Sequence, residues 1–336
     1  MTESAVAPRR TGPLYGPVPS RRLGRSLGVD LVPYKTCSYD CIYCQLGRTT
    51  CQTLERAEYV PTGQVLEALE RSLRRGSVVD FIGVAGSGEP TLHAGIGEVI
   101  AGIRRRTRIP VAVLTNGSLL GDAELRRDLA RAQVVIPSLD AGEARTFRRV
   151  NRPHPDLSFE GMVEGLAAFA ADFRGEIWLE IMFVAGINTS PQEVHRIARR
   201  VEGIGPQRIQ LNTVVRPPAE RFAKPVSRTK LQELARRLGE KAECIADFPS
   251  SAPGAARADR AVDRDILELL ARRPCTVADL AAGLVIHPQE AVKHLEHLLR
   301  RGLLAAEQAP GGERYFRCKR ARPARIRHKA QERNLS

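Results

Sequence analysis

The 336-residue sequence has few aromatic residues, a deficit of acidic charge and no long apolar runs. Phe, Trp and Tyr together make up 5% of it, with a single Trp. No stretch approaches the roughly 18 apolar residues that suggest a membrane-spanning helix. Residues 1–10 also lack the apolar segment of a secretory signal. We therefore expect a cytoplasmic protein without membrane contact, long enough for about two domains.

A disulfide framework is also lacking. Three of the seven cysteines fall within residues 37–44, and the others stand singly at Cys51, Cys244, Cys275 and Cys318. Small extracellular domains instead use many paired cysteines, so this distribution favours a reducing compartment. Each isolated cysteine is predicted to be a small buried hydrophobic residue.

Basic residues outnumber acidic ones, 52 to 38, which gives a formal net charge of +14 and a pI near 10.0. Lys and Arg that neutralise phosphates favour nucleic-acid binding. A coding bias toward Arg explains the same surplus without nucleic acid. Both interpretations stay open, and only clustered charge carries weight.

Three cysteines with three and then two residues between them occupy the loop at residues 36–44, TCSYDCIYC. The loop follows a strand-like run at residues 26–32. Iron–sulfur clusters are held by cysteine thiolates and usually take four of them. Three thiolates without an obvious fourth therefore indicate a cluster with one iron open to a substrate. A zinc knuckle or a chance group of cysteines is the alternative.

Cys37, Cys41 and Cys44, with Tyr43 before the third cysteine, resemble the C-x3-C-x-aromatic-C motif of the radical S-adenosylmethionine (radical SAM) superfamily. This resemblance implies a [4Fe–4S] cluster on the three cysteines, with the fourth iron bound by the amino and carboxylate groups of SAM. An electron donor such as a flavodoxin or ferredoxin is implied as well. Reduced SAM then yields a 5′-deoxyadenosyl radical that abstracts hydrogen from the substrate, and Tyr43 is expected near the adenine.

Strand and helix patterns alternate along the chain up to about residue 214. Apolar and β-branched runs predict strands at 26–32, 78–84, 111–114, 134–136, 177–184 and 208–214. Apolar residues at helical spacing predict helices at 62–73, 94–105, 123–130, 160–173 and 191–201. Such alternation predicts an α/β fold with parallel strands and right-handed crossovers. The superfamily resemblance implies that the six strands form a partial (β/α)6 barrel.

The second strand ends in a glycine-rich turn, Gly86-Ser87-Gly88-Glu89. Ligands of parallel α/β proteins bind at such strand ends. The turn resembles the Gly-Gly-Glu motif of the superfamily, with Ser87 between the glycines. The resemblance implies that this turn binds the SAM amino group, because Glu89 can accept a hydrogen bond from it. A glycine turn without a ligand is the alternative.

Short polar residues follow the third and fourth strands, at Asn116, Ser138 and Asp140. They are predicted to reach the SAM carboxylate and ribose hydroxyls, as the equivalent loops do in the superfamily. Turn formation and helix capping are the alternative roles of these residue types.

Residues 11–25, rich in Pro, Gly and Arg, predict an irregular lead-in to the first domain. Its arginines Arg21, Arg22 and Arg25 are candidates for holding an anionic group of a substrate, and solvation at the surface is the alternative.

Residues 14–245 are similar to the radical SAM branch that contains wyosine-type tRNA-modifying enzymes and uncharacterised Fe–S oxidoreductases. Segments 16–48 and 86–93 carry this similarity, which implies RNA as one candidate substrate. Wyosine-type enzymes carry extra cysteines for a second cluster upstream of the first. No cysteine precedes Cys37 in this chain.

A segment rich in Pro, Ser and Ala at residues 249–260 has linker composition and ends the first domain at residue 248. Three helical patterns follow, at 263–270, from Thr276 and from Pro288. Two strand-like segments at 303–307 and 314–317 then flank a glycine pair. The pattern predicts a small winged-helix domain at residues 261–318.

Clustered charge falls on the third helix of this domain and on the tail at residues 319–336. The exposed side of the helix is predicted to carry Lys293, His294, His297, Arg300 and Arg301. Such a helix enters the major groove in DNA-binding proteins. Protein contact or dimerisation is the alternative. The basic tail is predicted to be disordered and suited to phosphates.

Two hypotheses about function follow. The first is a radical SAM enzyme with an unidentified substrate, RNA among the candidates. The second is a redox-sensing Fe–S regulator that binds DNA through its winged helix without SAM turnover. The polar strand ends favour the enzyme, because a sensor does not need them.

Overall fold

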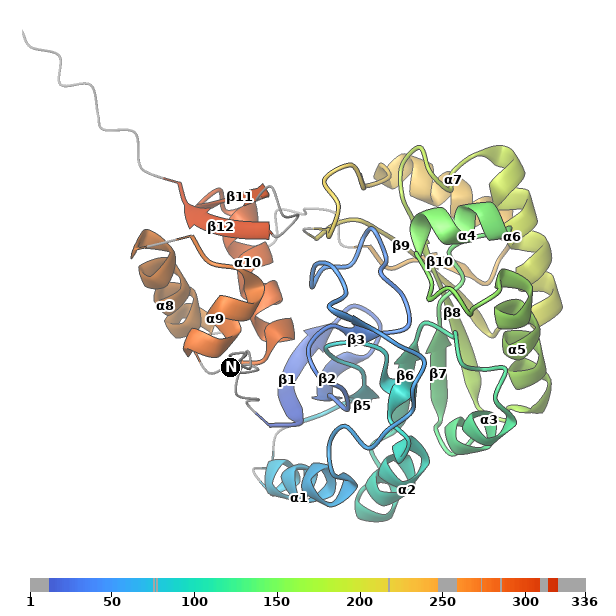
Figure 1. Ribbon diagram of the computed structural model, residues 1–336, viewed down its shortest axis with the longest axis horizontal. Coiled ribbons are helices and arrows are strands. Elements are labelled where there is room, and N and C mark those ends of the chain that lie inside the picture. Colours follow the sequence, from blue (N-terminus) through green and yellow to red (C-terminus); the bar gives the residue numbers. More distant parts are fainter. Residues whose placement is uncertain are drawn as a thin grey trace, which may run out of the picture.

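The computed structural model describes residues 12–74, 76, 78–216, 218–246, 259–272, 274–284, 286–308 and 314–319. Within them, a large hydrophobic core forms in the N-terminal α/β region and a smaller one in the C-terminal region. Figure 1 shows the α/β region as an arc of strands with helices around its outside, and the C-terminal region beside the first strand. Residues 249–258 of the predicted linker (249–260) and residues 320–336 of the predicted tail (319–336) lie outside the described residues.

Eight strands of the described chain form one sheet in the order β1-β2-β5-β6-β7-β8-β9-β10. β1 is antiparallel to β2, and every other neighbouring pair is parallel. The strands are β1 (Leu14–Ser20), β2 (Gly24–Val29), β5 (Phe81–Val84), β6 (Val111–Thr115), β7 (Val134–Pro137), β8 (Glu176–Phe183), β9 (Arg208–Thr213) and β10 (Ala242–Cys244). The parallel order from β2 to β9 confirms the predicted partial (β/α)6 barrel.

Helices on the outside of the arc connect the parallel strands (Figure 1). Several begin at a serine that accepts a backbone N–H, as at Ser158, Ser190 and Ser227. The helices are α1 (Thr62–Leu73), the short 3-10 helix η1 (Pro90–Leu92), α2 (Ile96–Arg106), α3 (Ala123–Leu129), α4 (Ala144–Val150), α5 (Phe159–Asp172), α6 (Pro191–Ile204) and α7 (Arg228–Leu238).

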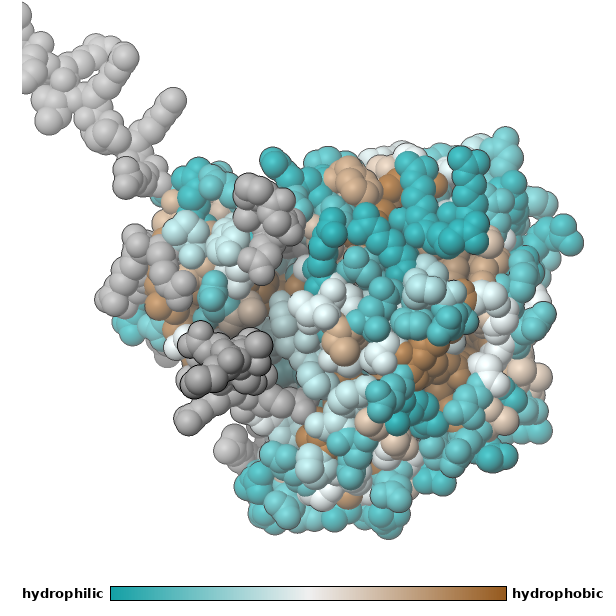
Figure 2. Space-filling view, in the orientation of Figure 1, coloured by the Kyte–Doolittle hydropathy of each residue, from teal (hydrophilic) through white to brown (hydrophobic). Residues whose placement is uncertain are grey.

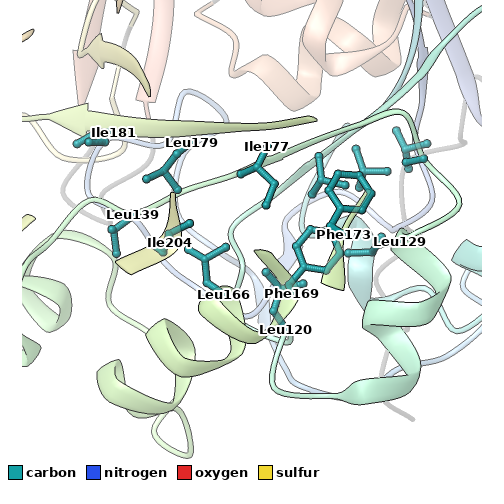
Figure 3. Close-up of a cluster of buried hydrophobic side chains, with 14 of the residues drawn as sticks. Leu120, Leu129, Leu139, Leu166, Phe169, Phe173, Ile177, Leu179, Ile181 and Ile204 are labelled. Carbon is teal, nitrogen blue, oxygen red and sulfur yellow. The ribbon is translucent and has the colours of Figure 1, made fainter. Parts of the chain in front are cut away.

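Both faces of the sheet are buried, because successive side chains of a strand point to opposite sides. In β6, Val111 and Val113 pack in the large core under the helices, whereas Ala112 packs in a separate cluster with Trp178 on the concave side. Figure 3 shows Leu166 and Phe169 of α5 in this large core. Burial of one such side chain contributes ~1.5–3 kcal/mol, so the helices fix the strand ends firmly.

The Pro and Gly content predicts an irregular segment at residues 11–25, but Leu14–Ser20 form β1. Two prolines are tolerated there because an edge strand leaves one row of backbone N–H groups outside the ladder. The pairing register of β1 and β2 shifts between Tyr15 and Val18, next to the first of these prolines.

The C-terminal region has three helices and a two-stranded hairpin, which confirms the predicted winged helix. Its elements are α8 (Asp259–Arg272), α9 (Val277–Leu284), α10 (Pro288–Arg300), β11 (Leu304–Gln308) and β12 (Arg314–Cys318). α8 begins four residues before the predicted helix. The core of this region includes Leu46, two residues after Cys44, so the cysteine loop and the winged helix pack together.

No helix in the described part of the chain is long and apolar enough to cross a membrane. The face drawn in Figure 2 is largely hydrophilic, with smaller hydrophobic areas between the polar ones.

Candidate functional site

The cysteine loop lies at the carboxyl end of β2. Cys37 closes the short strand β3 (Thr36–Cys37), which pairs with β4 (Cys51–Gln52). Each sulfur of the triplet is contacted by nitrogen from a different element. Asn116 Nδ2 lies 3.7 Å from Cys37 Sγ, Asn151 Nδ2 lies 3.6 Å from Cys41 Sγ, and Lys35 Nζ lies 3.2 Å from Cys44 Sγ.

Burial has a strong effect on the pKa of Cys37 and Cys41. It raises the pKa of the Cys37 thiol to about 12 and that of Cys41 well above its usual value, and the neighbouring sulfurs raise both further. These thiols therefore keep their protons until a positive centre replaces them. Metal binding to cysteine releases protons in this way.

In the part of the chain that the structure describes, no group of three or more Cys, His, Asp or Glu side chains converges as the ligands of a single metal ion. In an iron–sulfur cube each thiolate binds a different iron, so the three sulfurs need not converge on one point. Three mutually close thiols and a facing amide or ammonium at each sulfur are compatible with a cube.

Among the four isolated cysteines, Cys51 lies on the strand that pairs with β3, next to Cys37 in the cysteine loop. Cys275 is buried in the winged-helix core, as predicted for all four, and Cys318 is half-buried. Cys51 and Cys244 are exposed, so the prediction of burial is wrong for them. Cys51 begins the two-residue strand β4, and both residues of that strand are exposed.

Glu89 is buried to 2% exposure between the cysteine loop and the end of β6. Its Oε1 accepts hydrogen bonds from Thr91 N, Thr91 Oγ1 and Thr115 Oγ1, and its Oε2 accepts one from Asn116 N at 2.7 Å. Burial raises the pKa of the carboxyl and these donors oppose the change. A carboxylate oxygen accepts about two donors, so Oε2 retains room for a ligand ammonium.

Gly86 and Gly88 are required by close contacts of the turn. A Cβ on Gly88 would lie 1.8 Å from Thr36 O, and one on Gly86 would lie 2.3 Å from Asp30 Cγ. Real Cβ atoms do not approach other atoms so closely, so any other residue would push the turn away from the cysteine loop. The two glycines thus keep Glu89 beside Cys37.

Ser87 faces away from the cysteines. Its Oγ donates to Asp30 Oδ2 at 2.6 Å and its N–H to Asp30 Oδ1 at 3.1 Å. Asp30 Oδ2 also lies 2.9 Å from His287 Nε2 in the winged helix, and both side chains are buried. His287 Nδ1 accepts from Gln289 N, so the ring carries its proton on Nε2 and donates to Asp30. The cofactor contact predicted for Ser87 remains a prediction.

Tyr43 and Asp140 meet beside Cys41, the second cysteine of the triplet. The Tyr43 hydroxyl donates to Asp140 Oδ2, which also accepts from Asn151 Nδ2 at 2.7 Å, while Asp140 Oδ1 accepts from Met182 N. Burial raises the pKa of Asp140 to about 6, and these donors oppose the change. Ser138 lies at the end of β7, where its N–H donates to the carbonyl of Thr115.

The structure therefore gathers Tyr43, Glu89, Asn116 and Asp140 around the cysteine loop. Asn116 links Glu89 to this loop, because its N–H donates to Glu89 Oε2 and its Nδ2 donates to Ser38 Oγ at 2.8 Å and faces Cys37. The SAM contacts predicted for these residues are not tested by this geometry and stay predictions.

Three buried polar residues of the site escape prediction. Asp30 sits in an otherwise apolar run, which is the one signal that marks it. Lys35 has a φ of 60°, rare for a non-glycine residue and typical of functional loops. Asn151 caps α4, a helix with no clear pattern. Asn188 is fully buried as well and holds the turn after β8, because it accepts from Val184 N and donates to Asp140 O.

The predicted exposed side of α10 is wrong for most of its residues. Glu296, between them, is buried and pairs with Arg216 of the barrel at 2.7 Å, and Lys293 is half-buried beside it. His294 contacts Asp263 of α8 at 2.9 Å. Arg300 and Arg301 are exposed as predicted. The helix pattern alone does not reveal that the barrel covers this face.

Comparison with known families gives two matches. The sequence model described as the radical SAM superfamily matches residues 31–201, about half of the chain, and that of the MarR family matches residues 261–314. The first match contains the cysteine loop and the turn at residues 86–89. The second covers most of the winged helix.

Similar proteins occur in Helicobacter pylori and Brachyspira hyodysenteriae. A UPF0026 protein of Helicobacter pylori strain J99 is 31% identical over 290 residues, which are 85% of this chain and 91% of that protein. A Brachyspira hyodysenteriae protein named GTPase Obg is 37% identical over 303 residues, 90% of this chain. This chain spans 45% of the Brachyspira protein, less than half its length.

Among solved structures, a radical SAM methyltransferase from Sphaerobacter thermophilus resembles this chain with a TM-score of 0.50 at 18% identity. The match covers 67% of each chain. At that identity the likeness concerns the fold alone.

Proposed function

Because the chain belongs to the radical SAM superfamily and is therefore an enzyme of that class, we propose that Cys37, Cys41 and Cys44 hold a [4Fe–4S] cluster that binds SAM. Bound there, the cluster would supply the electron that cleaves SAM to methionine and a 5′-deoxyadenosyl radical, which modifies a substrate not yet identified. The observation that carries the proposal is the cysteine triplet packed against the buried carboxylate of Glu89.

The residues around the triplet would each have a separate task. Glu89 Oε2 would accept the SAM ammonium, since it has acceptor capacity left and a buried ionic hydrogen bond is strong. Asn116 would orient both Glu89 and Cys37, because it donates toward each of them. Tyr43, held by Asp140, would form one wall for the adenine.

Anaerobic reconstitution with iron and sulfide tests the proposal. We expect the wild-type chain to take up about four irons per chain and, after reduction with SAM present, to release 5′-deoxyadenosine. Cys41→Ala should lose most of the iron and all of the turnover. Cys51→Ser is the matched control, because this cysteine is exposed and lies seven residues beyond the triplet; it should behave as wild type. Full cluster uptake by Cys41→Ala would overturn the ligand assignment.

The alternative, a DNA-binding regulator, requires α10 to be accessible. The contact of Glu296 with Arg216 and that of His287 with Asp30 hold its first three turns against the barrel. DNA binding through α10 would therefore require the winged helix to leave this position. A mobility-shift measurement with duplex DNA decides the matter: sequence-specific binding that depends on cluster state, with no SAM cleavage, would favour the regulator.

A further inference from the structure

The winged helix is hydrogen-bonded both to the glycine-rich turn and to the end of the cysteine loop. Gln289 Nε2, in the first turn of α10, donates to Gly86 O at 2.9 Å. Gln289 Oε1 accepts from Gln45, the residue after Cys44, at 2.7 Å. Arg216 of the barrel joins them, since it donates to Gln45 Oε1 and pairs with Glu296 of α10. The start of α10 therefore forms part of the surroundings of the candidate site.

A cavity of about 100 Å3 lies at this junction, beside the concave side of β2, β5 and β6. A cavity of that volume holds several water molecules, so it has room for one tetrahedral oxyanion. Four of its twelve described lining residues are cations and none is a carboxylate: Arg21, Arg22, Arg216 and Lys293. Three come from the barrel and one from the winged helix.

Two carboxylates of the described residues lie beside these cations. Glu180 pairs with Arg22 and accepts from Asn212, and Glu296 pairs with Arg216 while also facing Arg300. Arg22 Nε is buried and meets no hydrogen-bond acceptor within the described residues.

The pKa of Lys293 reflects the positive charge around it. Burial together with the cations Arg216 and Arg21 lowers the pKa of Lys293 to about 8, although Glu290 and Glu296 oppose the change. Keeping a charged lysine buried beside other cations is unfavourable in free energy, and a bound anion would offset that cost.

We propose that this cavity is an anion subsite that binds the phosphate group of the substrate, with Arg21, Arg22 and Arg216 from the barrel and Lys293 from the winged helix as its donors. Four cations around one small cavity are more than a carboxylate ligand would need. They suit a phosphate, which carries more charge and more oxygen acceptors. The winged helix thereby supplies one wall of the substrate pocket. Calling the ligand a substrate rests on the proposed function, but the binding itself needs neither cluster nor SAM.

Calorimetric titration of the full chain without cluster tests the site, with inorganic sulfate as a probe that does not change protonation between pH 6 and 9. Ionic strength is held constant with chloride. Lys293→Met should weaken sulfate binding at least roughly tenfold, because a charge-assisted hydrogen bond contributes about 1.5–3 kcal/mol. Lys230→Met, at a half-exposed lysine of α7, is the matched control. Equal sulfate affinity of Lys293→Met and wild type would overturn the proposal.

The pH dependence gives a second, independent readout. Sulfate should bind wild type more weakly as pH rises through about 8, because Lys293 then loses its proton. The other charged groups that act on Lys293 are Arg21, Arg216, Glu290 and Glu296. Lys293→Arg should show a flat profile, since arginine does not lose its proton. A wild-type profile as flat as that of Lys293→Arg would contradict the role of Lys293.

Competition identifies the source of the phosphate. Displacement of sulfate by pyrophosphate but not by a short single-stranded RNA would assign the site to a free phosphorylated molecule. Displacement by RNA that is lost in Lys293→Met would assign it to a phosphodiester. Failure of both competitors would overturn the phosphate assignment. None of these outcomes depends on iron uptake or 5′-deoxyadenosine release, which test the proposed function separately.

Discussion

Ser87 and Glu89 lie two residues apart on one turn and are both buried, yet they face different parts of the molecule. The carboxylate of Glu89 gathers donors from η1 and the end of β6, next to Cys37. Ser87 instead donates to Asp30, which accepts from His287 of the winged helix. The Glu89 side retains acceptor capacity for a ligand, whereas the Ser87 side is a set of bonds between two domains.

This difference shows that one turn has two uses. Its glycines bring the backbone against the cysteine loop on one side and against Asp30 on the other. A shift of α10 would therefore reach Glu89 through Gln289, which holds Gly86 O, and through His287. The winged helix is thus mechanically coupled to the site where SAM is proposed to bind.

Among the variants that test the difference between the two sides of the turn, Glu89→Gln should have the largest effect. The substitution keeps the shape but removes the charge that is proposed to accept the SAM ammonium. The SAM dissociation constant should rise roughly ten- to a hundredfold, because a hydrogen bond to a charged group contributes about 1.5–3 kcal/mol. Equilibrium dialysis of the reconstituted protein with labelled SAM measures this change.

Thr91→Val is the matched control for Glu89→Gln. It removes the hydroxyl that donates to Glu89 Oε1 at 2.6 Å without changing the charge of the site. It should cost roughly 1 kcal/mol of stability and leave SAM affinity near that of wild type. If Glu89→Gln binds SAM as tightly as Thr91→Val does, the two sides of the turn do not differ as we describe.

His287→Ala should have an intermediate effect, confined to the other side of the turn. It removes the hydrogen bond to Asp30 and the stacking of the ring on Tyr15, whose centroids are 4.0 Å apart. Together these contribute about 2–4 kcal/mol to the docking of the winged helix. Hydrogen exchange should accelerate in α10 and in β1, with SAM affinity reduced less than in Glu89→Gln.

His294→Ala provides the comparison for His287→Ala. His294 contacts Asp263 at 2.9 Å within the winged helix and does not reach β1. Its removal should loosen α8 and α10 while exchange in β1 stays at the wild-type rate. Equal protection of β1 in the two variants would mean that His287 does not dock the domain.

Local patterns predicted the parts of the molecule whose partners are close in sequence. β-branched runs and helical spacing indicated the parallel strands, and the triplet Cys37, Cys41 and Cys44 was recognisable from its spacing. β1 escaped prediction because its prolines mimic an irregular loop, and β10 because it has only three residues.

Contacts between the domains were not predictable from local patterns. Asp30 and His287 are 257 residues apart in the sequence, and neither belongs to a motif. Lys293 and Glu296 follow the polar side of an amphipathic helix, which a sequence pattern places in solvent. The barrel covers that side instead, and Arg216 pairs with Glu296 at 2.7 Å, closer than Arg300 of α10 at 3.7 Å.

Ser87→Ala should have the smallest effect and separates the two uses of the turn most cleanly. The variant loses the bond from Ser87 Oγ to Asp30 but keeps the backbone N–H bond to the same carboxylate. About 1 kcal/mol of docking stability should be lost, seen as a slight rise in exchange at α10. SAM affinity should match wild type, because the hydroxyl faces away from the cysteines. A tenfold loss of SAM affinity in this variant would instead show that Ser87 contacts the cofactor, as Glu89 is proposed to do.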